Sequence, residues 1–201
     1  MEYTETQEAD CSFWNTIDET FLTNDRSNPA RAKAAEIIRE ELQSVRGKMT
    51  VAEIGPCNGF DYEDYFKSMK HLSYTGIEGS IERCKYLQAR FGSKLFEHGS
   101  FESLQNRKFS VLYTKATLEH QPHFAHCLQM LLRSARRLVV INWYIPPENA
   151  TELIRWNSEI RVHWNQYNKN DVLDCIHEEG WTQIEDIRVS GSTNSLYIVR
   201  R

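Results

Sequence analysis

The stretch from Thr50 to Ser80 constrains the fold of this chain more than any other. It opens with a short apolar segment ending in Glu53-Ile-Gly-Pro-Cys-Asn-Gly59 and closes with Tyr74-Thr-Gly-Ile-Glu-Gly-Ser80. A strand, a glycine-containing turn, a helix and a second strand ending in an acid form the first half of a nucleotide-binding βαβ unit. Glu78 follows Gly59 by 19 residues, a spacing that suits a carboxylate bound to a ribose diol.

Strand-like and helix-like segments alternate along the rest of the chain. Asn28 and Pro29 predict a helix start, Ser80 predicts another, and Pro122 is expected to open a third. The pattern predicts strands over 50–54, 74–78, 94–97, 109–113 and 138–142, with helices over 61–69 and 80–91 between them. Residues 151–170 are interpreted as an inserted helix plus loop, followed by a helix over 169–179 and strands over 182–189 and 194–200. Such alternation predicts a parallel sheet with helices on both faces.

The order of these motifs resembles the class I S-adenosylmethionine-dependent methyltransferases. The segments that carry the resemblance are E-x-G-x-x-x-G from Glu53, the acid Glu78, and the stretches 99–104, 109–122 and 137–143, which together span about residues 48–145. Two positions depart from the family pattern, because Cys57 replaces the middle glycine and Ser100 replaces the acid of the third-strand loop. The resemblance implies a doubly wound α/β domain over 29–201, whose seven-stranded, mostly parallel sheet ends in a C-terminal antiparallel hairpin.

S-adenosylmethionine is the cofactor that the resemblance implies. Glu53 suits its ammonium end and Glu78 suits both ribose hydroxyls; the alternative is that both acids are merely solvated. Cys57 is interpreted as a small turn residue rather than a nucleophile, since no paired base is evident. The predicted cofactor-binding residues are Glu53, Gly55, Cys57, Gly59, Glu78, Gly79, Ser100 and Phe101.

Residues for the transfer step are sought after the fourth strand. His120 could act as a general base, since imidazole titrates near neutrality. The alternative, that Glu119 and His120 cap or orient the next helix, is favoured, because methyl transfer often needs positioning more than proton removal. Tyr113 and Lys115 are further candidates beside the methyl group. His120, His123 and His126 recur every third residue, but a helix starting at Pro122 separates them, so no metal site is predicted.

Aromatic residues gather beyond the fifth strand, in an acceptor-side insert at about 146–168. They are interpreted either as the wall of an acceptor pocket or as packing of the insert onto the sheet edge, with neither favoured. The candidate acceptor residues are Trp143, Tyr144, His163 and Trp164.

Composition limits the classes of protein and of partner that fit this chain. The 201 residues are 40% hydrophobic and 26% charged, as in an ordinary soluble domain. A net charge of −4 disfavours nucleic acid as a partner. No apolar run reaches 18 residues and the acidic N-terminus is unlike a signal peptide, so no membrane association is predicted.

Five single cysteines with no C-x-x-C pair indicate a reducing cytoplasm. Residues 1–28 are interpreted as an arm or lid, with Phe13, Trp14 and Ile17 closing over the cofactor.

These features predict an enzyme that transfers a methyl group from S-adenosylmethionine to a small-molecule acceptor. The alternatives are a non-catalytic module that binds the same cofactor, an RNA methyltransferase, and a nicotinamide-dependent oxidoreductase, which the missing G-x-G-x-x-G disfavours. Neither the acceptor nor the oligomeric state follows from the sequence.

Overall fold

A single sheet organises the chain. Residues 13, 19–149, 152–159 and 161–201 are described by a computed structural model. The strands are β1 (Met49–Ile54), β2 (Leu72–Glu78), β3 (Phe96–His98), β4 (Phe109–Lys115), β5 (Ala135–Trp143), β8 (Gln183–Arg188) and β9 (Ser195–Arg200). They lie in the order β3-β2-β1-β4-β5-β9-β8, and the first five are parallel. Because β9 runs antiparallel to both β5 and β8, the predicted fold class, with its C-terminal hairpin, is confirmed.

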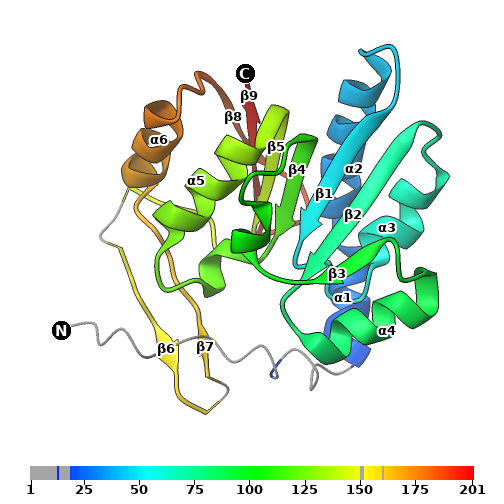
Figure 1. The fold of residues 1–201 in the computed structure, drawn as a ribbon. Helices are drawn as coiled ribbons and strands as arrows, with labels where there is room; N and C mark the ends of the chain where they lie inside the picture. Colours follow the sequence, from blue (N-terminus) through cyan, green and yellow to red (C-terminus); the bar gives the residue numbers. More distant parts are fainter. Residues whose placement is uncertain (1–12, 14–18, 150–151, 160) are drawn as a thin grey trace.

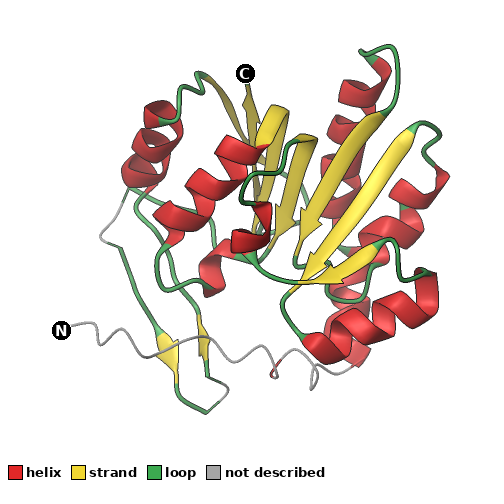
Figure 2. Cartoon of the chain, viewed as in Figure 1, coloured by secondary structure: helices red, strands yellow, loops and turns green. Residues whose placement is uncertain are grey.

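Helices cover both faces of this sheet (Figures 1 and 2). Alternate side chains of a strand point to opposite faces, so Val51 packs with α2 (Pro29–Gln43), η2 (Phe66–Ser68) and α4 (Ile81–Phe91). Its neighbour Ala52 packs on the other face, with η3 (Phe101–Leu104), α5 (Phe124–Ser134) and α6 (Lys169–Glu178). Two apolar cores thus hold the strands in place and fix where their carboxyl ends lie.

Helix starts follow local side-chain chemistry. Asn28 caps α2 by accepting a hydrogen bond from the Ala30 N–H at 3.0 Å, and Ser80 caps α4 by accepting one from Arg83 at 3.2 Å, as predicted. The helix expected over 61–69 is instead divided into α3 (Phe60–Asp64) and η2, because Tyr65 between them leaves the helical conformation. The helix expected at Pro122 begins at Phe124.

The insert differs most from the sequence-based prediction. The inserted helix within 151–170 is wrong, since the described residues form a small hairpin of β6 (Trp156–Asn157) and β7 (Val162–His163). A bridge between Leu153 and Gln166 extends the pairing. Bulky and β-branched side chains favour an extended chain here, where they pack across the hairpin, as in the 4.7 Å ring contact of Trp156 and His163.

Two elements flank the carboxyl ends of the parallel strands. The arrowheads of β1, β2 and β4 point to the end of the molecule where α1 (Glu19–Ser27) and the β6–β7 hairpin lie (Figure 1). Trp14 and Ile17, the other residues of the predicted lid besides Phe13, fall outside the described residues. In the described part of the chain, no helix is long and apolar enough to span a membrane.

Candidate active site

A cavity of about 670 Å³ opens at the carboxyl ends of the strands. Its size is typical of small-molecule sites, and its place is where open α/β sheets bind ligands. Six of the eight predicted cofactor residues line it, namely Gly55, Cys57, Glu78, Gly79, Ser100 and Phe101. Its other polar and aromatic lining residues come from α1, the α2 cap, η3, the end of β4, the segments after β4 and β5, and the hairpin regions: Asn24, Asp25, Asn28, Glu102, Lys115, Thr117, His120, Gln121, Tyr144, Trp164 and Asn194.

The loop after β1 brings backbone close to this cavity. Gly55 has a φ of +73°, and a Cβ there would lie 2.6 Å from Thr117 Oγ1, so the position requires glycine. Gly59 also has a positive φ, but a Cβ there would clash with Leu87 and Phe91 at 2.8 Å. Gly59 therefore serves helix packing behind the loop, and it does not line the cavity.

Glu78, the last residue of β2, ties this loop to the next helix. Its Oε2 accepts a hydrogen bond from the Cys57 N–H and its Oε1 accepts one from the Ser80 N–H, both at 2.9 Å. The residue is 4% exposed, and burial raises the pKa of the carboxyl while these N–H groups oppose the shift. Each carboxylate oxygen keeps a further lone pair, so Glu78 can accept two hydroxyl groups from the cavity.

Glu53 lies outside the cavity lining. Its side chain is fully buried on the face that α2 covers, where its Oε2 accepts a hydrogen bond from Tyr74 Oη at 2.6 Å. Burial, and next the Asp61 carboxylate, raise the pKa of Glu53. This acid therefore supports the sheet below the loop and is not in position to contact a ligand in the cavity.

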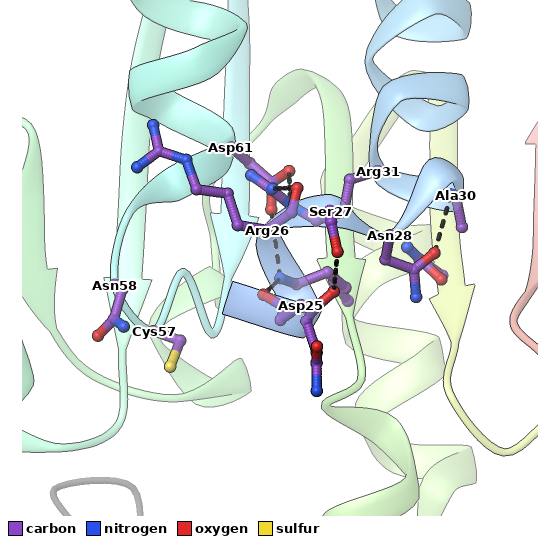
Figure 3. Close-up of polar contacts among 12 residues, drawn as sticks. Asp25, Arg26, Ser27, Asn28, Ala30, Arg31, Cys57, Asn58 and Asp61 are labelled. Carbon is purple, nitrogen blue, oxygen red and sulfur yellow. Dashed lines mark hydrogen bonds and ion pairs between the residues drawn. The ribbon is translucent and has the colours of Figure 1, made fainter. Parts of the chain in front are cut away.

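A chain of buried charges joins α1 to the strand ends. Arg31 is fully buried, and its Nε donates to Asp61 Oδ1 at 2.9 Å, as the cluster in Figure 3 shows. Lys115 Nζ contacts Asp61 Oδ2 at 3.6 Å and Asp25 Oδ2 at 2.5 Å. Burial alone would lower the pKa of Lys115, but Asp61 and Asp25 raise it above its ordinary value. The Asp25–Lys115 ion pair thus stays charged and lies in the cavity wall.

His120 borders the cavity on the other side. Its Nδ1 lies 2.6 Å from the His163 carbonyl oxygen, which can only accept, so this nitrogen carries the proton and Nε2 keeps the lone pair. Burial lowers the pKa of His120 to about 4, so the ring is neutral at physiological pH. The third candidate for the transfer step, Tyr113, is 1% exposed in the sheet interior and does not line the cavity.

The aromatic candidates divide into two groups. Tyr144 and Trp164 line the cavity, with ring centroids 6.0 Å apart in an edge-to-face arrangement. Trp143 and His163 are fully buried behind them and do not line it. One pair therefore lines the cavity, and the other pair packs in the core.

Several solved structures resemble this chain in fold. No protein-family model and no curated protein matches it. The Burkholderia thailandensis 1,6-didemethyltoxoflavin-N1-methyltransferase, solved with 1,6-didemethyltoxoflavin and S-adenosylhomocysteine, is 14% identical with a TM-score of 0.70, over 95% of this chain and 86% of that one. Magnesium protoporphyrin IX methyltransferase from Synechocystis, with S-adenosylmethionine bound, is 12% identical with a TM-score of 0.63, over 94% and 88%. The N-terminal domain of EvdMO1, in the presence of S-adenosylhomocysteine and D-fucose, is 15% identical with a TM-score of 0.62, over 84% and 82%.

This chain has the class I methyltransferase fold. Within that fold, Cys57 stands where the pattern has a glycine, and its φ of +54° is a conformation that side chains other than glycine rarely adopt. Burial and the nearby Glu78 raise the pKa of the Cys57 thiol to about 11, so it is protonated and a poor nucleophile. Ser100 occupies the other departing position, where its side chain hydrogen-bonds Glu102 at the cavity rim.

Sequence reasoning placed Asn142 at the carboxyl end of its strand, beside the expected crevice, but missed the amide groups of Asn28 and Asn194. Asn28 Nδ2 donates to Asn194 Oδ1 at 3.2 Å, and Asn194 Nδ2 donates to Asn142 Oδ1 at 2.7 Å. This network joins the start of α2, the β8–β9 turn and the end of β5, and its first two members line the cavity. The only signal in the sequence was that Asn28 caps a helix and Asn194 lies in a turn. No cluster of metal-binding side chains occurs among the described residues.

Proposed function

We propose that this chain transfers a methyl group from S-adenosylmethionine to a small-molecule acceptor. One observation carries the proposal: the Glu78 carboxylate and the positive-φ loop that begins at Gly55 face the same cavity, at the strand ends of a methyltransferase fold. A carboxylate that already fixes two backbone N–H groups is rigid, and can accept both hydroxyl groups of a ribose without reorganising. Gly79, Ser100 and Phe101 continue this wall and would border the adenine.

The Asp25–Lys115 pair would hold the amino-acid end. S-adenosylmethionine carries one ammonium and one carboxylate group there, and this pair supplies the opposite charges from the cavity wall. Glu53, expected from the sequence to meet the ammonium, is bonded to Tyr74 instead, and Asp25 takes that role in our proposal. Binding would exchange one ion pair within the protein for two with the ligand.

The chain's own residues would position the reaction and exclude water. When bound, S-adenosylmethionine supplies an electrophilic methyl group, which the acceptor's lone pair attacks in line as the carbon–sulfur bond breaks. Thr117, the neutral His120 and Gln121 line the cavity and would help to enclose the acceptor. No covalent intermediate with Cys57 is required, since its thiol is protonated.

A small acceptor suits the cavity better than RNA. Among the described residues, no arginine lines it and the one lysine is paired with an aspartate, so these residues offer phosphate groups no free positive charge. Two of the structures with this fold are named for small-molecule acceptors. Free thiols at Cys57, Cys84, Cys127 and Cys175 support the further proposal of a cytoplasmic location.

Isothermal titration calorimetry with S-adenosylmethionine, S-adenosylhomocysteine and NAD tests the proposal. We expect the first two ligands to bind and NAD not to bind. Binding of NAD alone, or of none of them, would refute the proposal. Cofactor binding without methyl transfer to any compound of a metabolite library would instead favour the non-catalytic module.

A further inference from the structure

A second cavity, of about 580 Å³, opens at the other end of the sheet from the candidate active site. It lies where α2 ends and where β1 and β2 begin, so the arrowheads of these two strands point away from it (Figure 1). Its volume is in the range of small-molecule sites. The two cavities share no described lining residue, so a ligand bound here would take no part in the proposed methyl transfer.

Three basic side chains line this second cavity: Arg39 of α2, and Lys70 and His71 of the connection between η2 and β2. No acidic residue stands among its described lining residues. Within the part of the chain that the structure describes, these three side chains form no hydrogen bond or ion pair. Arg133 and Arg137, near the start of β5, each pair with a glutamate instead. The cavity thus gathers basic groups that lack a counter-charge.

The acids of α2 do not neutralise these basic groups. Glu36 pairs with Lys33, and Glu41 pairs with Arg137. Glu40 is exposed and lies outside the described lining. A cleft lined by charges of one sign concentrates their field and attracts ions of the opposite sign. The second cavity therefore favours an anion, although the chain as a whole carries a net charge of −4.

Apolar side chains form the rest of this surface. Met49 is 3% exposed, and Leu42, Val45 and Met69 are partly buried against the core that α2 covers. An inorganic anion would leave these side chains facing water, whereas an apolar group attached to the anion would cover them. Because methionine side chains adapt their shape to what they contact, apolar groups of different outlines fit here.

Backbone hydrogen bonds hold the two sides of the second cavity together. The Met49 N–H donates to the His71 carbonyl oxygen, and the Met69 N–H donates to the Phe66 carbonyl oxygen, both at 3.0 Å. His71 has a φ of +71°, which residues other than glycine rarely adopt. The connection before β2 is therefore fixed beside the start of β1, and a ligand would find its partners already in place.

From the basic groups, the apolar surface and their fixed backbone, we propose that this cavity is a second ligand site, for a small organic anion. Its apolar body covers Met49 and the side chains around it, and its carboxylate or phosphate group meets Arg39, Lys70 and His71. Arg39 can donate two parallel N–H bonds to such a group, and Lys70 adds a point charge. The site binds and does not react, and it goes beyond the proposed function without depending on it.

Isothermal titration calorimetry at constant ionic strength tests the proposal with matched probes. Octanoate and octyl phosphate carry both the charge and the chain; 1-octanol lacks the charge, and acetate and inorganic phosphate lack the chain. We expect at least one octyl anion to bind at least tenfold more tightly than all three incomplete probes. The tighter of the two octyl anions identifies the head group. If neither exceeds the incomplete probes, the proposal is wrong.

Variants locate the binding. Arg39→Gln and Lys70→Gln should each weaken the binding of the tighter octyl anion by about tenfold, as expected for one charged contact. Lys94→Gln is the matched control, because Lys94 is an exposed lysine before β3 and lies outside the described lining; it should leave this affinity unchanged. Equal affinities in the three variants, whether unchanged or lowered alike, would overturn the proposal. The basic side chains would then serve only the carboxyl end of α2. No step of this test uses S-adenosylmethionine, so its failure and that of the proposed function are separate results.

Discussion

The two halves of the cavity are built in different ways. The proposed cofactor half comes from one continuous stretch, Gly55–Phe101, and depends on backbone groups that a single carboxylate, Glu78, holds in place. The proposed acceptor half is assembled from separate segments, those after β4 and β5 and the residues that follow β7, joined by side-chain hydrogen bonds. The cofactor half therefore tolerates few residue types, whereas the acceptor half can change its specificity without moving the sheet. Substitutions in the two halves should accordingly affect different ligands.

The largest effect is expected at Glu78. Glu78→Ala removes the proposed acceptor of both ribose hydroxyls and leaves the Cys57 and Ser80 N–H groups without their partner. Because hydrogen bonds to a charged group contribute about 1.5–3 kcal/mol, we expect roughly a hundredfold loss of affinity for S-adenosylhomocysteine by calorimetry.

Glu97→Ala is the matched control for Glu78→Ala. Glu97 lies on β3, the strand next to β2, and pairs with Arg107 outside the cavity lining. The Glu97→Ala variant should leave the affinity for S-adenosylhomocysteine unchanged. Equal losses in both variants, or none in Glu78→Ala at an unchanged circular dichroism spectrum, would contradict the assignment of Glu78 to the ribose.

Glu119 should make the stability of the protein depend on pH. Burial raises the pKa of Glu119 from 4.5 to about 7. The folded state thus holds this proton more tightly than the unfolded state, so the resulting stabilisation is complete below about pH 4.5 and is lost as pH rises through about 7. Glutamine keeps a carbonyl oxygen for the Tyr144 and Ile145 N–H groups but does not titrate.

Glu119→Gln should therefore flatten the pH dependence of stability. Relative to the wild type, the free energy of unfolding of the variant should rise by on the order of 2 kcal/mol between pH 4.5 and pH 8, measured by urea denaturation. Glu148→Gln changes an exposed carboxylate of the same connection and should reproduce the wild-type profile. Parallel profiles for the wild type and Glu119→Gln would show that Glu119 does not titrate in this range.

Asp25 tests whether the cofactor half extends onto α1. Asp25→Asn should weaken the binding of S-adenosylhomocysteine by about tenfold, as expected for one charged contact. It should leave the binding of 5′-methylthioadenosine, which lacks the amino-acid end, unaffected. Asp64→Asn is the control, because Asp64 also ties α1 to the domain, through Arg26, without lining the cavity. If both variants weaken the binding of both ligands alike, Asp25 acts by docking α1 and not by binding the amino-acid end of the cofactor.

The fold and most of the cofactor half could be predicted from the sequence because their signals are local. The glycine turn, the capping residues Asn28 and Ser80, and the acid Glu78 each act within a few residues of their own position. Glu53 shows the limit of such reasoning. Spacing places it near the end of β1, but only the packed structure shows that its side chain turns to Tyr74 on the α2 face.

The rest of the cavity was less predictable because its contacts are long-range. Asp25 meets Lys115 across 90 positions of the chain, and Asn28 meets Asn194 across 166. The aromatic insert has no hydrophobic period of 3.6 or 2 residues that would predict its conformation. Hydrogen bonds to residues 118–121 stabilise it instead. Its composition left an acceptor wall and core packing equally open, and the position of Tyr144 depends on its hydrogen bond to the Glu119 carboxylate.

The smallest predicted effect concerns the strain in the cofactor loop. Cys57 adopts a φ of +54°, a conformation that costs a residue with a Cβ about 1–2 kcal/mol. Cys57→Gly relieves this strain but adds about 0.5–1 kcal/mol of unfolded-state entropy, so we expect a net gain below about 1 kcal/mol. This corresponds to a rise in Tm of at most a few degrees in a domain of this size.

Cys57→Ala keeps the Cβ and loses only the thiol, and should show no such rise. Since the Cys57 N–H still donates to Glu78 in both variants, their affinity for S-adenosylhomocysteine should match the wild type. A loss of affinity in both would mean that the thiol itself contacts the ligand, and the cofactor half would then depend on a side chain as the acceptor half does.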